Sequence, residues 1–66
     1  MTVKQFQEKY HEYKTENEQE ATIEAMKLRV VDENGKVEVV RPIKLGDEWC
    51  LILNSAAKLL EDTGII

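Results

Sequence analysis

The sequence predicts an α+β fold in the order α-β-β-β-α, with a three-stranded antiparallel meander and two helices packed on one of its faces. Three observations predict this fold. Apolar residues near the N-terminus recur at helical spacing, two β-branched runs flank Asn34-Gly35, and Gly64 follows a second helical pattern. The chain of 66 residues is expected to form one small domain, residues 1–66.

The first helix is expected at about residues 3–16. Thr2 and Gln5 have the spacing of a capping box, in which each side chain accepts a hydrogen bond from the backbone N–H of the other. Apolar residues then recur every three or four positions, which places them on one stripe of a helix. These residues are Val3, Phe6, Tyr10 and Tyr13. Because an isolated helix of this length is marginal in water, the stripe is expected to pack on the rest of the domain.

An acidic run follows this stripe. Glu16, Glu18 and Glu20 would lie where the helix macrodipole is negative, which is an unfavourable place for carboxylates. We therefore expect the helix to stop early, with Asn17 as a left-handed cap and residues 18–21 as a solvated connection. The alternative is that the acidic run faces something basic.

Three strands are expected, at about residues 23–31, 36–45 and 49–53. A two-residue turn at Asn34-Gly35 would pair Val30 with Val39, whereas a three-residue loop would shift the register by one and place Glu38 opposite Val30. We favour the two-residue turn, which directs one set of apolar side chains toward the helices. This set is Met26, Leu28, Val30, Val37 and Val39. Residues 23–26 would also suit a helix.

The second half of the chain contains a proline and the last helix. Pro42 has no N–H to donate, so we expect it at an edge, a bulge or a strand end. The last helix is expected at about residues 55–63, with Asn54-Ser55 at its start and Gly64 after its end. We interpret residues 49–53 as a strand, although this run could instead open the last helix.

This order of elements, and the length of the chain, are similar to those of a double-stranded-RNA-binding domain. That family has a basic stretch at the start of its last helix, where this chain has residues 54–58 with Lys58 as the one basic residue. The resemblance therefore covers topology and implies no binding of RNA.

The outer face of the predicted sheet is apolar. With Trp49 facing the helices, this face carries Val31, Val40, Cys50 and Ile52. With the other register of the third strand it carries Trp49, Leu51 and Leu53 beside Val40. Exposed apolar patches usually mark interfaces, so we predict a homo-oligomer, most simply a two-fold dimer. If one helix covered each face, this surface would instead be buried within the domain. The interface candidates are Val31, Val40, Cys50, Ile52, Ile65 and Ile66.

The composition argues against several classes of partner. Nine basic residues are outnumbered by thirteen acidic ones, and the net charge is −4, so no direct nucleic-acid partner is expected. The longest apolar run, residues 49–53, is too short to span a membrane, and the first residues are not a signal peptide. With one cysteine and one histidine, we expect no internal disulfide, no zinc site and no other cofactor. These features favour a cytoplasmic protein, of a size and composition common among small phage or mobile-element proteins.

Tyr10-His11-Glu12-Tyr13 is the one cluster that resembles a catalytic site, because histidine beside glutamate can carry out acid–base chemistry. His11 lies off the packing stripe, however, and we interpret it as a solvated surface residue. Cys50 lies in an apolar run without basic neighbours to lower its pKa, and is expected to be inert. We predict that the chain is not an enzyme.

Two classes of function remain. The first is a protein-binding module that acts by contact, as an adaptor, inhibitor or regulator, and that self-associates. The alternative is an acidic mimic of nucleic acid that blocks a DNA- or RNA-binding protein. The carboxylates of such a mimic would be Glu12, Glu16, Glu18, Glu20 and Glu24. Binding by the mimic should weaken steeply with salt, and an apolar contact should not.

Overall fold

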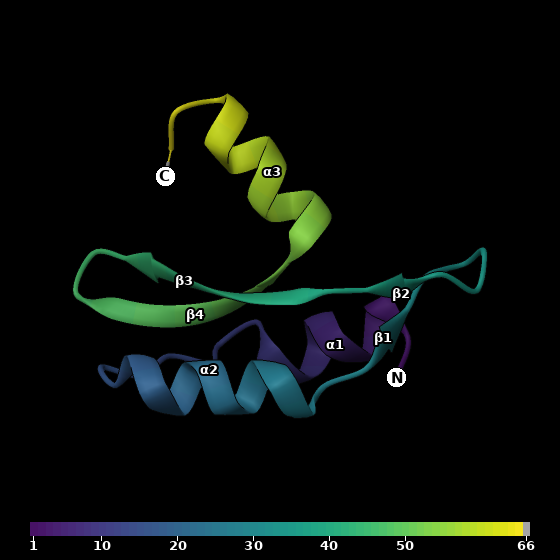
Figure 1. Cartoon of the computed structure of the whole chain (residues 1–66), viewed down its shortest axis with the longest axis horizontal. Coiled ribbons are helices and arrows are strands. Elements are labelled where there is room, and N and C mark those ends of the chain that lie inside the picture. The colour runs from purple at the N-terminus through teal and green to yellow at the C-terminus, as the bar shows by residue number, and fades with distance from the viewer. Residues whose placement is uncertain (66) are drawn as a thin grey trace.

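The structure is a computed structural model that describes residues 1–65, and over these residues it is α+β, with three helices and two two-stranded antiparallel sheets (Figure 1). The elements are α1 (Val3–Tyr10), α2 (Glu18–Lys27), β1 (Val30–Val31), β2 (Val37–Glu38), β3 (Val40–Leu45), β4 (Glu48–Leu53) and α3 (Asn54–Asp62). The α+β class is thus confirmed. The predicted three-stranded meander is not formed, because β1 pairs with β2 and β3 pairs with β4.

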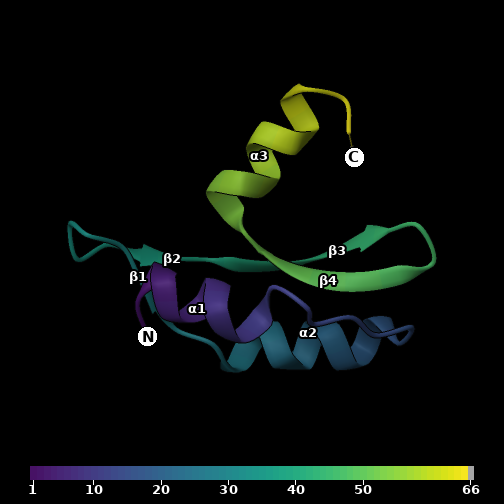
Figure 2. The same ribbon diagram turned by 180° about the vertical axis from the view of Figure 1, so that it is seen from behind.

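The helices also pack differently from the prediction. Helices α1 and α2 lie on one side of the β3–β4 ribbon, and α3 stands on the other side, as both views show (Figures 1 and 2). The prediction that both helices pack on one face is therefore wrong. The alternative, in which each face carries a helix, is closer to the observed arrangement. The α-β-β-β-α order that resembles a double-stranded-RNA-binding domain is also absent, since a second helix separates α1 from the first strand.

Helix α1 begins as predicted and ends earlier. The N–H of Gln5 donates to the Thr2 hydroxyl over 3.1 Å, and the N–H of Thr2 donates to Gln5 Oε1 over 2.9 Å, which confirms the capping box. The helix ends at Tyr10 rather than near residue 16. Beyond it, Thr15 exchanges two backbone hydrogen bonds of 3.0 and 2.6 Å with Trp49. This bridge requires extended backbone at Thr15, so the helix has to stop before it.

Asn17 begins a helix instead of ending one. Its Oδ1 accepts from the backbone N–H groups of Gln19 (2.9 Å) and Glu20 (3.3 Å), and its φ of −101° is not left-handed, so the predicted cap is wrong. Glu18 and Glu20 consequently lie in the first turn of α2, where the macrodipole is positive and carboxylates are stabilising. The acidic run that is unfavourable at a helix C-terminus is favourable here, and the solvated connection predicted at residues 18–21 is helical.

The strand predicted at residues 23–31 is therefore reduced to Val30–Val31. Residues 23–26, whose pattern also suits a helix, belong to α2. Two small residues on the inner side of α2, Ala21 and Ala25, are buried and bring the helix close to the sheet. The predicted strand at residues 36–45 is divided at Val39 into β2 and β3.

The hairpin has the register of the three-residue loop. Val30 pairs with Glu38 and Val31 with Val37, so the favoured pairing of Val30 with Val39 is wrong. The carboxylate of Asp32 accepts from the N–H groups of Asn34 (2.8 Å) and Lys36 (2.9 Å) and organises the loop. Gly35 takes the left-handed conformation, with φ of 79°, whereas Asn34 does not. A type I′ turn needs positive φ at both positions, and this loop needs it at the glycine alone.

The β3–β4 ribbon confirms the strand expected at residues 49–53, since β4 spans Glu48–Leu53. Because Trp49 directs its N–H and C=O away from β3 toward Thr15, alternation along the ladder directs those of Leu51 the same way. Pro42, which lies opposite Leu51, therefore has its nitrogen on the free edge of β3. A residue without an N–H fits this position, so the edge placement predicted for Pro42 is confirmed.

Helix α3 ends as predicted. The N–H groups of Gly64 and Ile65 donate to the carbonyls of Glu61 (3.1 Å) and Leu60 (3.0 Å), which is the hydrogen-bond pattern of a Schellman motif with Gly64 at φ of 78°. The start of the helix differs from the prediction: Asn54 is already helical, and Leu53 caps the helix without a side-chain hydrogen bond, so neither Asn54 nor Ser55 is the N-cap.

The main core lies between the β3–β4 ribbon and the pair α1 and α2. Val30 is fully buried in it, while Trp49, Tyr13, Val3 and Leu28 pack at its border. The buried members are Phe6, Tyr10, Ala21, Ala25, Val30, Val40, Leu51 and Leu53. On the opposite side of the ribbon, Ala57 of α3 and Ile43 of β3 are buried.

Candidate protein-binding surfaces

The predicted interface residues do not form one patch. Val40 is a core residue with 8% of its surface exposed, so its predicted place on the outer face is wrong. The register error in the hairpin explains this, because a shift of one residue exchanges the two faces of a strand. Val31 is half-buried in the separate β1–β2 ribbon. Ile65 is 64% exposed after α3, and Ile66 lies outside the described residues.

Cys50 and Ile52 do lie on the outer face of the β3–β4 ribbon, as predicted. They pair with Ile43 and Arg41 of β3, and cross-strand partners point to the same face. Arg41 identifies this face, because its guanidinium bonds the carboxylate of Glu61 in α3 over 2.8 Å. Helix α3 therefore lies on the outer side of the ribbon, and both Cys50 and Ile52 are half-buried rather than fully exposed.

Helix α3 leaves part of its own apolar side uncovered. Ala57 faces the ribbon and is fully buried, while Leu60 is half-buried. Leu59 is 65% exposed and Ala56 is also exposed, and the helix stands away from the ribbon (Figure 1). The protruding side of α3, defined by Ala56, Leu59 and Leu60, is one candidate surface.

A groove lies beside the start of this helix, between α1 and β4. It has a volume of about 200 Å³ and contains no Asp, Glu, Lys or Arg among its described lining residues. We call it the α1–β4 groove. Its lining is Phe6, Gln7, Tyr10, His11, Leu51, Ile52, Leu53 and Ala56.

A second apolar groove, of about 300 Å³, lies between α2 and the strands β2 and β3. Met26, Val37 and Val39 border it and are 80%, 53% and 61% exposed. The prediction from sequence placed these three residues on the helix-facing side of the sheet, and this is wrong. It assumed that residues 23–26 form a strand and that the hairpin has a two-residue turn. The lining of this α2–β3 groove is Thr22, Ala25, Met26, Leu28, Val37, Glu38, Val39, Val40 and Pro42.

The acidic candidates do not project as one free row. The carboxylate of Glu24 accepts from the Tyr10 hydroxyl (2.8 Å), and that of Glu20 accepts from the Thr15 hydroxyl (3.0 Å). Glu18 lies in the first turn of α2, while Glu12 and Glu16 lie in the connection before it. At least two of the five carboxylates therefore hold the fold together, which leaves fewer of them to imitate phosphates.

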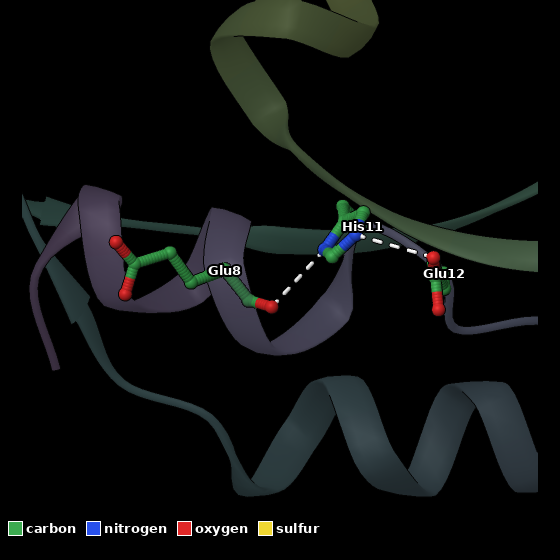
Figure 3. A network of polar contacts seen from close by, with 3 residues as sticks. All are labelled: Glu8, His11 and Glu12. Atoms are coloured by element: carbon green, nitrogen blue, oxygen red, sulfur yellow. Dashed lines mark hydrogen bonds and ion pairs between the residues drawn. The ribbon is translucent and has the colours of Figure 1, made fainter.

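His11 is a surface residue at the end of α1 (Figure 3). Its Nδ1 lies 3.0 Å from the carbonyl oxygen of Glu8, and its Nε2 lies 3.5 Å from Glu12 Oε1. The His11 and Glu12 side chains are 64% and 88% exposed, so the pair lies in solvent. Tyr10 points away from it into the core, where burial and then the hydrogen bond to Glu24 raise its pKa to about 12. The four-residue cluster is thus divided between core and surface.

The thiol of Cys50 faces the carbonyl oxygen of Ile43 at 3.5 Å. Burial raises the pKa of this thiol, an effect that its own backbone and Lys14 only partly oppose. A neutral thiol is a weak nucleophile and a weak metal ligand. Within residues 1–65, no group of three or more His, Cys, Asp and Glu side chains is arranged to hold a metal ion.

No protein-family model, curated protein or solved structure matches this chain. In the part of the chain that the structure describes, none of the helices has the length and apolar character needed to cross a membrane. The candidate surfaces for a partner are the α1–β4 groove, the α2–β3 groove and the protruding side of α3.

Proposed function

We propose that this chain is a small acidic protein-binding module of the cytoplasm, which acts by contact as an adaptor, inhibitor or regulator and also self-associates. The observation that carries the proposal is the α2–β3 groove with its exposed border of Met26, Val37 and Val39. Large apolar side chains gathered around a hollow are typical of protein-binding surfaces. Burying them is favourable by about 25 cal/mol for each Å² removed from water.

The groove has a defined shape before any partner arrives. Helix α2 is held against the ribbon by its buried residues Ala21 and Ala25, and Val40 on the groove floor belongs to the core. A preformed surface loses little conformational entropy on binding, which favours affinity. Met26 adds adaptability, because its unbranched side chain fits partners of different shape.

The proposal is tested by capture of partners with the full chain and two variants, Met26→Glu and Val39→Glu. For a partner whose binding to the wild type saturates, we expect each variant to capture about tenfold less or lower still. The reason is that the new carboxylate would be buried in an apolar contact. Lys58→Gln is the matched control, since it changes the net charge by the same amount on the polar side of α3. Both substituted side chains are mostly exposed, so circular dichroism and the melting temperature should stay as in the wild type.

Salt separates this function from the acidic mimic. Capture through an apolar groove should persist between about 0.15 M and about 0.5 M salt, whereas screening should abolish capture by a phosphate mimic. If Met26→Glu and Val39→Glu bind as the wild type does, while Glu12→Gln and Glu16→Gln lose binding at low salt, the proposed module is wrong and the mimic replaces it.

A further inference from the structure

We infer that the hairpin loop is a site of spontaneous covalent modification, in which the backbone nitrogen of Gly35 attacks the side-chain amide of Asn34 and converts it to isoaspartate. The rate is set by how often the loop, which Asp32 holds closed, opens. Water is the one further reactant. The inference goes beyond the proposed function and does not depend on it.

The reaction exchanges one amide bond for another and involves no oxidation or reduction. The Gly35 nitrogen bonds to Cγ of Asn34, its proton leaves with the side-chain amine as ammonia, and a succinimide ring remains. Water then opens the ring at one of its two carbonyl carbons. Opening at the former backbone carbonyl gives isoaspartate, and opening at the former side-chain carbonyl gives aspartate. In either product a neutral amide has become a carboxylate, so the net charge changes from −4 to −5.

The side chain of Asn34 is free to react. Asn34 and Gly35 are both exposed. The backbone N–H of Asn34 donates to Asp32 Oδ1 over 2.8 Å, but no hydrogen bond of its side chain occurs within residues 1–65. A Cβ placed on Gly35 would meet nothing within 4 Å, so the ring and the incoming water have room. Glycine also lacks the side chain that crowds the attacking nitrogen after other asparagines.

The other two asparagines of the chain are held in place. Asn17 caps α2, and its Oδ1 accepts from two backbone N–H groups of that helix, while the side chain of Glu18 crowds the next nitrogen. Asn54 is half-buried at the start of α3, and its N–H donates to the carbonyl of Val39 over 2.7 Å. The helical backbone fixes the nitrogen that follows it. We therefore expect Asn34 to be the reactive asparagine.

The closed loop keeps the Gly35 nitrogen away from Cγ of Asn34. The N–H of Gly35 donates to the carbonyl of Asp32 over 3.0 Å, and Asn34 has no positive φ, which is the pattern of a type I turn. In such a turn ψ at the third residue is about 0°, whereas ring closure needs this nitrogen to eclipse Cβ, a rotation of roughly 120°. The turn therefore has to open before the nitrogen can attack.

Asp32 restrains this opening. Its Oδ1 accepts from the N–H groups of Asn34 (2.8 Å) and Lys36 (2.9 Å), and its backbone N–H donates to the carbonyl of Lys36 over 2.9 Å. Together with the bond from Gly35, these contacts close the loop around one residue. Exposed loops open locally without unfolding of the whole domain, so the reaction proceeds slowly in the folded chain. Asp32 is thus a positioning residue, which acts by holding the Gly35 nitrogen.

Isoaspartate should weaken the hairpin. Its main chain passes through the former side chain and is one methylene longer, whereas the pairing of Val31 with Val37 sets the length of the present loop. The longer loop cannot keep both this pairing and the bond between Asp32 and Lys36 without strain. The new carboxylate also follows Asp32 and Glu33 in sequence, and like charges this close repel.

The first test follows the full chain at neutral pH and physiological temperature over several weeks. Trypsin places the three asparagines in separate peptides, residues 15–27, 30–36 and 45–58. Modification raises the mass of a peptide by about 1 Da, and a methyltransferase specific for isoaspartate identifies the product. We expect peptide 30–36 to be modified about tenfold faster than the other two, and to stay unmodified in Asn34→Gln.

Two results of this test would overturn the inference. One is a peptide 30–36 that stays unmodified in the folded chain while the urea-unfolded chain is modified. The other is equal modification of all three asparagine peptides.

The second test measures the restraint by Asp32. Asp32→Ala removes the acceptor of two N–H groups and should raise the rate at Asn34 about fivefold or more. Glu33→Ala is the matched control, since it removes the neighbouring carboxylate, whose side chain forms no hydrogen bond within residues 1–65, and it should change the rate less than about twofold. Equal rates in the two variants contradict the restraint. As a measure independent of folding in the variants, urea-unfolded wild type should react about fivefold or more faster than folded wild type, and equal rates contradict the closed loop.

The third test isolates the effect of the longer main chain. Asn34→Asp has the charge of the aspartate product and a normal main chain, so it is the control for the purified isoaspartate form. The isoaspartate form should have the lower melting temperature. Equal melting temperatures would show that the hairpin tolerates the added methylene and would contradict the predicted weakening.

Discussion

The hydroxyl of Tyr10 donates a hydrogen bond of 2.8 Å to the carboxylate of Glu24 and thereby joins α1 to α2. Tyr10 also stacks on Phe6, with ring centroids 5.4 Å apart, and meets Tyr13 edge-on at 5.7 Å. Tyr10 thus joins an aromatic row, which runs from α1 to Tyr13 beyond its end, to a hydrogen bond with the neighbouring helix. Such a tie matters in a domain of 66 residues that has a single cysteine and therefore no internal disulfide.

Tyr10→Phe should lower the free energy of unfolding by about 1–2 kcal/mol, because it leaves a part-buried carboxylate without its donor. Urea denaturation measures this change. Tyr13→Phe is the control, since no hydrogen bond of the Tyr13 hydroxyl occurs within residues 1–65, and it should change stability by less than about 0.5 kcal/mol. Equal effects of the two substitutions would show that the Tyr10–Glu24 bond contributes nothing specific.

The stability that Tyr10 contributes should decrease between about pH 10 and pH 12. Burial, followed by the hydrogen bond and the charge of Glu24, raises the pKa of Tyr10 from 10.0 to about 12. The unfolded chain releases this proton first, so the stabilisation is complete below pH 10 and is lost as the pH rises through the folded pKa. The stability difference between wild type and Tyr10→Phe should therefore narrow across this interval in urea titrations. A difference that stays constant to pH 12 would contradict the raised pKa.

Asn17→Ala should destabilise the domain by about 1 kcal/mol, since the backbone N–H groups of Gln19 and Glu20 lose their acceptor. Asn17→Asp should be nearly neutral, because aspartate is an equally good N-cap and its charge suits the positive end of α2. The thermal midpoint of each variant provides the measurement. A left-handed cap would show the opposite preference, tolerating glycine and rejecting aspartate.

Gly35→Ala should destabilise the β1–β2 hairpin by roughly 1–2 kcal/mol, because a Cβ is strained at φ of 79° even though it would touch nothing within 4 Å. Asn34→Ala should change stability by less than about 0.5 kcal/mol, because Asn34 has no positive φ and takes part through its backbone N–H. Similar losses at both positions, measured by urea denaturation, would indicate a type I′ turn instead.

Features that depend on a few neighbouring residues could be predicted from the sequence. The Thr2–Gln5 capping box and the Gly64 end of α3 are local hydrogen-bond patterns. Strand β4 was predictable because its run is short, apolar and bounded by turn residues. Pro42 is similar, since the missing N–H restricts it wherever the strand lies.

The parts that could not be predicted depend on distant contacts. Whether Glu18 ends one helix or begins the next is decided by the Thr15–Trp49 bridge, which joins residues far apart in the sequence. The hairpin register depends on whether Asp32 supplies the loop acceptor, a choice that the Asn34-Gly35 pair does not reveal. Both errors affect the same surface. The sequence pattern places Met26 and Val39 in the core and Val40 on the outside, whereas in the structure Met26 and Val39 are exposed and Val40 is buried.

The protected edges of the β3–β4 ribbon limit how copies of this chain can accumulate. A two-stranded ribbon with bare edges is a template onto which further strands can add without end, as in amyloid fibrils. Here Pro42 removes a donor from one edge, and Thr15 occupies the other edge at Trp49. Open-ended growth by strand addition to the β3–β4 ribbon is therefore obstructed on both of its edges.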